Sequence, residues 1–111
     1  MGSTRGVALS STQEYVDYAL DLLSGVPEVT TRKMMGETML YASGRLIGGV
    51  YDDRLLLKAT PNSEMMLPDA PRETPYEGLK TEMLLVDIED RGWLAQVVAS
   101  MLPELPAPKK R

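Results

Sequence analysis

Residues Val29–Ala59 read VTTRKMMGETMLYASGRLIGGVYDDRLLLKA, and this stretch decides the fold. Short runs of apolar residues alternate in it with residues that favour turns, a pattern typical of antiparallel strands joined by hairpins. Ser43-Gly44 and Asp52-Asp53 each lie between two such runs, where hairpin turns are expected. The stretch therefore predicts an antiparallel β-meander.

A glycine pair, Gly48-Gly49, falls inside one of the expected strands. Glycine has no side chain to pack, so a pair within a strand predicts a bulge or a place where other atoms approach closely. We expect a helix to make that approach. A phosphate-binding loop is the weaker interpretation, because such a loop opens onto a helix and needs a nearby lysine.

The segment before the meander has the pattern of an amphipathic helix. Ser11 and Glu14 have the spacing of a capping box, and Gly25 is placed to stop the helix in a left-handed conformation. Between them apolar residues recur at three- and four-residue spacing, while acidic residues fall mostly on the other side. We expect the apolar face of this helix to dock.

The segment after the meander is more mixed. Thr60-Pro61 predicts the start of a short helix that runs through Leu67, and the proline-rich residues 68–80 predict an irregular crossover. Met83–Val86 reads as one more strand. A final helix is expected from about Asp90 to Leu102, with Trp93 on its docking face.

These elements predict an α+β fold with a single domain: an antiparallel β-meander sheet packed by an N-terminal and a C-terminal helix. Within the 111 residues we expect a mobile N-terminal arm at 1–10, the domain at 11–103, and a proline-rich basic tail at 104–111. The eight methionines are expected mainly to fill the core.

Composition excludes several chemistries. The chain has no cysteine and no histidine, so thiol catalysis, disulfides, catalytic triads that use histidine and ordinary zinc sites are all ruled out. Carboxylates, lysine, tyrosine and serine are what remain for catalysis. No stretch approaches the ~20 apolar residues that cross a bilayer, and the first residues lack a signal-peptide core, so we expect a cytoplasmic protein with no membrane contact.

The net charge of −4 argues against general nucleic-acid binding, because neutralising phosphates requires a cationic surface. The chain ends in Lys109-Lys110-Arg111, so the remainder is more acidic still. We therefore expect direct nucleic-acid binding to be absent.

Four ordered motifs resemble the TfoX N-terminal domain family over about residues 11–108. They are Arg32–Glu37 with Leu40-Tyr41, Asp52–Ala59, Pro75–Gly78 and Glu89–Leu94. The resemblance implies an antiparallel sheet with flanking helices. It also implies regulation of bacterial competence, where a protein of this family acts as a coactivator with the cyclic-AMP receptor protein. It supplies no catalytic residues.

Two departures from the family pattern affect the expected function. Competence regulators of this family carry a second domain after the N-terminal one, and nothing before Arg111 resembles it, so we do not expect coactivation by the same route. Met35 stands where the family usually places an aromatic, a change that a packed core tolerates when volume is kept.

Arg32, Lys33, Glu37 and Tyr76 form the candidate interaction surface. Arg32 and Lys33 lie beside the expected first strand and suit an acidic partner or a phosphate. The alternative is that both are solvated charges that discourage edge pairing, or that Arg32 braces Glu37. Tyr76 lies in the irregular segment, where its phenol is better placed for binding than for packing.

Carboxylates offer a second interpretation. A water-rich Mg²⁺ site is conceivable with Glu37, Asp52, Asp53 and Asp87. Turn chemistry explains Asp52 and Asp53 without a metal, and helix capping explains Asp87 or Asp90. Because those roles suffice, we predict no metal and no cofactor.

The sequence therefore predicts a non-enzymatic module that acts through protein contacts, possibly homodimeric through an edge strand of the meander, in transcriptional regulation. The alternative is a small-ligand-binding or Mg²⁺-binding, enzyme-like protein. That alternative places a pocket between the sheet and the 68–80 segment, with Arg32, Glu37 and Tyr76 as its polar residues.

Overall fold

Four strands form from the turn-divided stretch, as its pattern predicts: β1 (Val29–Met34), β2 (Glu37–Ala42), β3 (Arg45–Val50) and β4 (Leu55–Lys58). In the computed structural model, which describes residues 12–34, 36–75 and 81–106, each strand pairs antiparallel with the next. The turns Ser43-Gly44 and Asp52-Asp53 both have positive φ at each residue, the geometry that matches strand twist in a tight hairpin.

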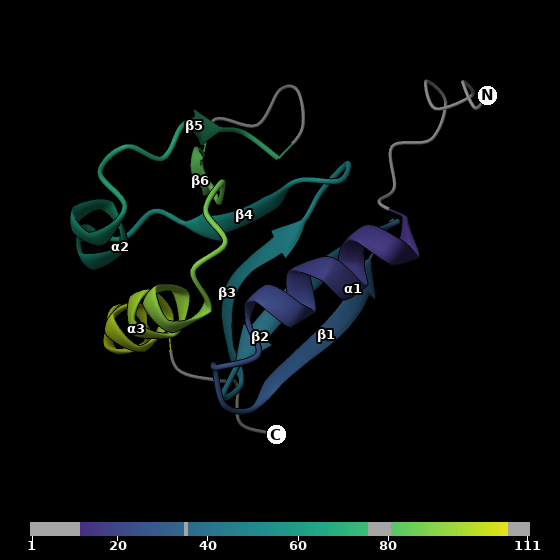
Figure 1. Cartoon of the computed structure of the whole chain (residues 1–111), viewed down its shortest axis with the longest axis horizontal. Coiled ribbons are helices and arrows are strands. Elements are labelled where there is room, and N and C mark those ends of the chain that lie inside the picture. The colour runs from purple at the N-terminus through teal and green to yellow at the C-terminus, as the bar shows by residue number, and fades with distance from the viewer. Residues whose placement is uncertain (1–11, 35, 76–80, 107–111) are drawn as a thin grey trace.

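Two further strands complete the sheet. β6 (Met83–Leu85) pairs antiparallel with β4, and β5 (Arg72–Glu73) pairs with the outer side of β6, giving the order β1-β2-β3-β4-β6-β5 (Figure 1). The sheet edges are therefore β1 and β5. β5 falls in the 68–80 segment that the sequence predicts to be irregular, and two residues are too few to show a strand period.

Helices cover one face of this sheet. α1 (Gln13–Leu22) and α3 (Arg91–Met101) lie on the same side of it, with α2 (Pro61–Met66) beside α3 (Figure 1). Buried residues of α1 and α3 share one cluster with Leu40, Ile47 and Leu57 of the strands. The predicted α+β class, an antiparallel sheet packed by the first and last helices, is confirmed.

The N-terminal helix begins and ends differently from the prediction. Its cap is Thr12, whose hydroxyl accepts a hydrogen bond from the backbone N–H of Tyr15 at 3.1 Å, and Ser11 lies outside the described residues. The helix ends before Gly25, which does not take a left-handed conformation. A Cβ on Gly25 would lie 3.2 Å from that of Ala95, so this glycine allows α3 to pack closely.

The glycine pair in β3 permits close approach, but not by a helix as we expected. A Cβ on Gly48 would lie 2.1 Å from the carbonyl oxygen of Leu56, on the adjacent strand β4. A Cβ on Gly49 would lie 2.7 Å from the ring of Tyr51. The register of β2 with β3 also shifts by one residue beside Gly48. Strand backbone and an aromatic ring therefore explain the pair.

The two helices of the C-terminal part, α2 and α3, begin at the expected residues. The packed part of the chain extends further toward the C-terminus than expected. Asp90 caps α3 by accepting from the backbone N–H of Trp93, and Thr60 caps α2. Trp93 is 37% exposed, so it lies at the margin of the docking face. A 3₁₀ turn follows at Leu102–Glu104, and Leu105 is buried in the core, so the predicted tail boundary after residue 103 falls too early.

Methionine fills the core less than expected. Of the six methionines in the described ranges, Met83 and Met101 are buried, whereas Met34 and Met65 are exposed. Leucine, valine and isoleucine make up most of the buried cluster instead. Their branched side chains have fewer rotamers to lose on burial than methionine has.

Candidate interaction surface

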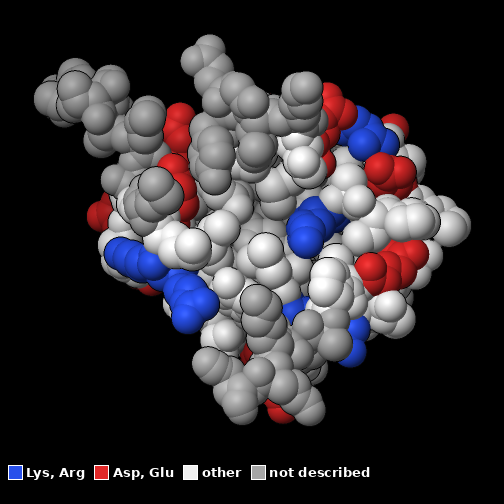
Figure 2. All heavy atoms as spheres, turned by 180° about the vertical axis from the view of Figure 1, so that it is seen from behind, with Lys and Arg blue, Asp and Glu red and all other residues white. Residues whose placement is uncertain are grey.

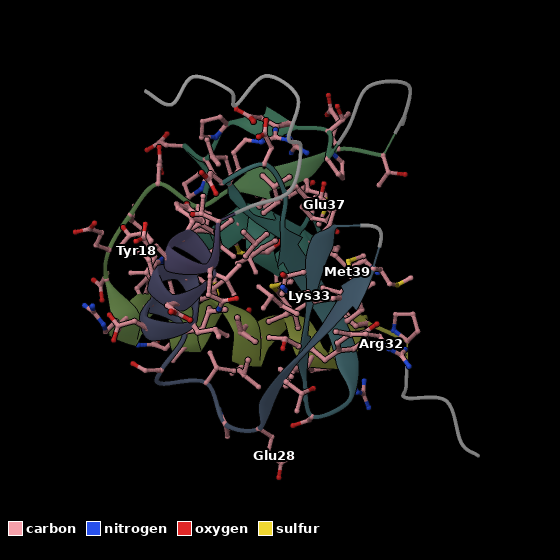
Figure 3. All side chains as sticks on the ribbon, turned by 90° about the vertical axis from the view of Figure 1, so that its right-hand side faces the viewer. Tyr18, Glu28, Arg32, Lys33, Glu37 and Met39 are labelled. Carbon is pink, nitrogen blue, oxygen red and sulfur yellow. The ribbon has the colours of Figure 1, made fainter. Side chains whose placement is uncertain are left out.

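Three of the four residues that the sequence singles out lie on one hairpin. Arg32 and Lys33 are neighbours on β1, and Glu37 begins β2 across the turn (Figure 3). Tyr76 lies outside the described residues. The hairpin is therefore where a candidate site has to be built.

β1 is exposed along nearly its whole length. Only Val29 is half-buried, and every residue from Thr30 to Met34 is exposed. In the register with β2, alternate residues of β1 lie opposite the buried Leu40 and Thr38, yet they are not covered themselves. The strand thus projects beyond the helices, with solvent on both of its faces.

Arg32 and Lys33 point to opposite faces of the sheet (Figure 3). Arg32 lies opposite Met39, on the face that carries no helix, and Lys33 lies opposite the buried Thr38, on the side of α1. Within residues 12–34, 36–75 and 81–106, neither cation makes a hydrogen bond or an ion pair. Both side chains are therefore available to another molecule.

The other arginines in the described ranges are held by the chain itself. Arg45 donates to the carbonyl oxygens of Leu102 and Leu105, at 2.7 and 3.1 Å, and so fixes the end of α3. The remaining three pair with carboxylates: Arg54 with Glu73, Arg72 with Glu64 and Arg91 with Asp21. Arg32 is the exception among the arginines that the structure describes.

Apolar side chains surround Arg32 on its face of the sheet. Met34 is 46% exposed, and Met39 and Tyr41 of β2 are half-buried. We call these four residues, Arg32, Met34, Met39 and Tyr41, the helix-free surface. Figure 2 views the sheet from the side away from α1 and shows an uncharged central area with scattered basic residues, and with acidic residues mainly toward the margins.

Glu37 is a partly buried carboxylate at the end of the hairpin. Its Oε1 atom is buried without a hydrogen-bond partner among the described residues, and no ion pair joins it to Arg32 there. Burial raises the pKa of the Glu37 carboxyl, and the nearby Asp52 charge adds to this, against a backbone hydrogen bond from Asp52 and the charge of Arg54. The expected brace between Arg32 and Glu37 is not formed.

A cavity of about 200 Å³ lies on the helix-free side of the sheet, near the position that the ligand-binding alternative predicts. Its described lining is mostly apolar and includes Leu46, Tyr51, Met83 and Pro75, with Lys58 and Glu82 as its charged residues. Neither Arg32 nor Glu37 lines it. The pocket and the basic strand are therefore separate features.

Several acidic residues in the described ranges serve in turns, caps and ion pairs. No group of three or more of them is placed to hold a metal ion in that part of the chain. Asp52 and Asp53 form the β3–β4 turn, and Asp53 also accepts a hydrogen bond at 2.9 Å from the backbone N–H of Thr12. Turn geometry thus accounts for this pair.

Arg54 is a structurally important residue that the sequence did not reveal. Its guanidinium donates to the Glu73 carboxylate at 2.6 Å and to the carbonyl oxygens of Thr74, Pro75 and Tyr51. These contacts fasten β5 and the following residues to the β3–β4 turn. The only local signal was an arginine directly after a tight turn.

Comparison with known proteins places the chain. The model of the TfoX N-terminal domain family matches residues 21–99, which include all six strands. The chain belongs to the TfoX N-terminal domain family. A relative of this TfoX N-terminal domain, an uncharacterized 12.7 kDa protein in the trpE 5′ region of Spirochaeta aurantia, is 26% identical over 104 residues, covering 93% of this chain and 90% of that protein.

The family match includes the whole hairpin that carries the helix-free surface of this TfoX N-terminal domain. In the described part of the domain, no helix combines the length and the apolar character required to cross a membrane.

Proposed function

We propose that this TfoX N-terminal domain is a non-enzymatic regulatory module that binds another protein through the helix-free surface, with Lys33 contacting the same partner from the other face of β1. The observation that carries the proposal is Arg32, the arginine of the described ranges that no other described residue holds. We propose further that it acts in transcriptional regulation in the cytoplasm, and membership of the TfoX N-terminal domain family supports this role.

The chemistry of the surface suits a protein more than a nucleic acid. Arginine, methionine and tyrosine are enriched at protein interfaces, and all three meet on this surface. A guanidinium pairs with a carboxylate through two parallel hydrogen bonds, and flexible thioethers adapt to an apolar neighbour. A chain with net charge −4 repels phosphates over most of its surface. We therefore infer a partner that presents a carboxylate beside apolar side chains.

Affinity capture with charge-reversed variants tests this function. The tagged chain is incubated with a nuclease-treated lysate of its host, and captured transcription proteins are purified and titrated against the wild type and Arg32→Glu. We expect Arg32→Glu to weaken binding to the purified partner at least tenfold, because the guanidinium contact becomes a repulsion between carboxylates.

Arg72→Glu is the charge control, since it makes the same charge change at an exposed position on the opposite edge strand, β5, and Arg72→Ala is measured beside it because both variants break the Arg72–Glu64 ion pair. Binding that survives Arg72→Glu and is lost in Arg32→Glu supports the proposal. Equal weakening by both variants, or capture that is insensitive to Arg32→Glu, would contradict it. Circular dichroism of both variants confirms that they remain folded.

The ligand-binding alternative has one observation in its favour, the cavity on the same side of the sheet. At about 200 Å³ it is smaller than most drug-sized sites and is suited to a small apolar molecule with one charged group. A thermal-shift screen of metals, nucleotides and small carboxylates tests it. A ligand at a hundred times its dissociation constant adds about 2.7 kcal/mol to stability, so a true ligand would be detected.

A further inference from the structure

The outer edge of β1 has a defined pattern of available backbone groups. The backbone N–H of Ser43 donates to the carbonyl oxygen of Glu28, so this pair of residues is a hydrogen-bonded pair of the β1–β2 ladder. Such pairs alternate along antiparallel strands. In this register the backbone N–H and C=O groups of Thr30, Arg32 and Met34 point toward β2. The backbone N–H and C=O groups of Val29, Thr31 and Lys33 point to the outer edge.

β1 has few of the features that protect an edge strand. It contains no proline, its register with β2 is regular, and Val29-Thr30-Thr31 is a run of β-branched residues that favours extended backbone. Arg32 and Lys33 are charged side chains of the kind that protect an edge, but β1 has six exposed or half-buried residues and is not shortened by a bulge or covered by a helix of the described chain. Backbone pairing with another strand is therefore sterically open.

The pattern on this edge is symmetric about Thr31. If a second β1 pairs antiparallel with the axis at Thr31, then Thr31 faces Thr31 of the second copy, and Val29 faces Lys33 on each side. All outward N–H and C=O groups of the three residues then find partners, which gives six hydrogen bonds. We propose that this edge binds a second copy of the same chain, so that two six-stranded sheets become one continuous sheet across a two-fold axis.

The side chains are compatible with this register. The Thr31 pair can form a cross-strand contact between hydroxyls, and the aliphatic part of Lys33 covers Val29 of the second copy. On the other face Arg32 lies opposite Thr30, so no two like charges are directly opposed. Shifting the register by two residues, to centre it on Arg32, would instead oppose two guanidinium groups, which is unfavourable.

The dimer leaves the helix-free surface available. Arg32 and Met34 project from the face of the sheet rather than from its edge, so pairing places two copies of that surface side by side. The inference does not depend on the proposed function, because the edge uses backbone groups and the partner-binding surface uses side chains. A five-residue strand pair is a small interface, so we expect a weak dimer whose population rises with concentration.

Charge substitution at the axis tests the inference. Sedimentation equilibrium of the full chain over a range of concentrations should show a species of twice the 12.2 kDa mass. Thr31→Lys and Thr31→Glu each place two like charges opposite one another, so we expect each variant to dimerise about tenfold more weakly than the wild type. An equimolar mixture of the two should regain the wild-type dimer or exceed it, because lysine then faces glutamate.

Gln96→Lys and Gln96→Glu are the matched controls, since Gln96 is exposed on α3 and carries the same change of charge away from the edge. Both should dimerise as the wild type does, and thermal unfolding verifies that all variants are folded. A wild type that stays monomeric at every concentration would overturn the proposal. Failure of the mixture to recover the dimer would overturn the Thr31 register.

Discussion

The two edge strands of the sheet each carry two charged residues but use them differently. On β5, Arg72 pairs with Glu64 at 3.0 Å and Glu73 pairs with Arg54 at 2.6 Å, so its charges are used within the chain. On β1, Arg32 and Lys33 have no such partner in the described residues. The comparison teaches that a charged residue on an edge strand is used within the chain when another element supplies a side chain of opposite charge. Where no such side chain is supplied, as on β1 in the described residues, the charge can contact another molecule.

The largest expected effect tests the closed edge. Arg54→Ala removes hydrogen bonds to the Glu73 carboxylate and to the carbonyl oxygens of Thr74 and Pro75, which leaves half-buried acceptors without a donor. We expect the free energy of unfolding to fall by about 2 kcal/mol, measured by urea denaturation. A loss no greater than that of Arg32→Ala would remove the contrast between the two edges.

Proline substitution sharpens the description of the open edge. Thr30→Pro removes an N–H that faces β2, whereas Thr31→Pro removes one that faces outward. Both impose the same ring, so their difference isolates one ladder hydrogen bond. We expect Thr30→Pro to be less stable than Thr31→Pro by about 1 kcal/mol in urea denaturation. If Thr31→Pro were the less stable variant, the backbone N–H of Thr31, and not that of Thr30, would be the one that bonds to β2.

Glu37 is expected to make the free energy of unfolding depend on pH. Its raised pKa means that the folded chain binds the proton more tightly than the unfolded chain does. The stabilisation from protonation is therefore present at low pH and is lost as the pH rises through the folded-state pKa. We expect Glu37→Gln to be more stable than the wild type at neutral pH by up to about 1 kcal/mol.

This advantage of Glu37→Gln should disappear as the pH falls below the ordinary pKa of a glutamate, because both side chains are then neutral. Thermal unfolding across the acid range measures it. An advantage that is constant with pH would mean that burial does not shift the titration of Glu37.

The smallest effect is expected on stability at the open edge. Arg32→Ala and Lys33→Ala remove exposed side chains that contact no charged group in the described residues. We expect each to change the free energy of unfolding by less than about 0.5 kcal/mol. Urea denaturation measures this, and a larger loss from Arg32→Ala would indicate a structural role for the guanidinium in place of a binding one.

Much of the fold was predictable because its signals are local. The two hairpin turns, the caps at Thr60 and Asp90 and the strand at Met83 each depend on residues within a few positions of one another. The short strand β5 and the roles of Gly25 and the Gly48-Gly49 pair were missed or misassigned. These features depend on which distant backbone or side chain approaches, and no local pattern records that.

The candidate site was predicted only as a stretch of chain. The sequence marked Arg32, Lys33 and Glu37, and the structure places them on one hairpin. The sequence could not show that Arg32 and Lys33 point to opposite faces of the sheet or that Glu37 is partly buried. Nor could it show that Arg45 and Arg54 hold distant segments of the fold together. Tyr76 stays a prediction. Roles of arginines are hard to predict because a long side chain reaches carboxylates far along the sequence.

The sequence by itself determined the antiparallel meander, the flanking helices and the exclusion of cysteine and histidine chemistry, because periodicity, turn residues and composition are properties of the linear chain. Only the tertiary structure decided that β1 is an outer strand, since strand order follows from the packing of all six strands and the two longer helices. That placement leaves Arg32 without a counter-charge in the described chain and the outer groups of Val29, Thr31 and Lys33 available. The chain fixes where an arginine stands, but the packing of the strands decides whether a carboxylate of the same chain reaches it.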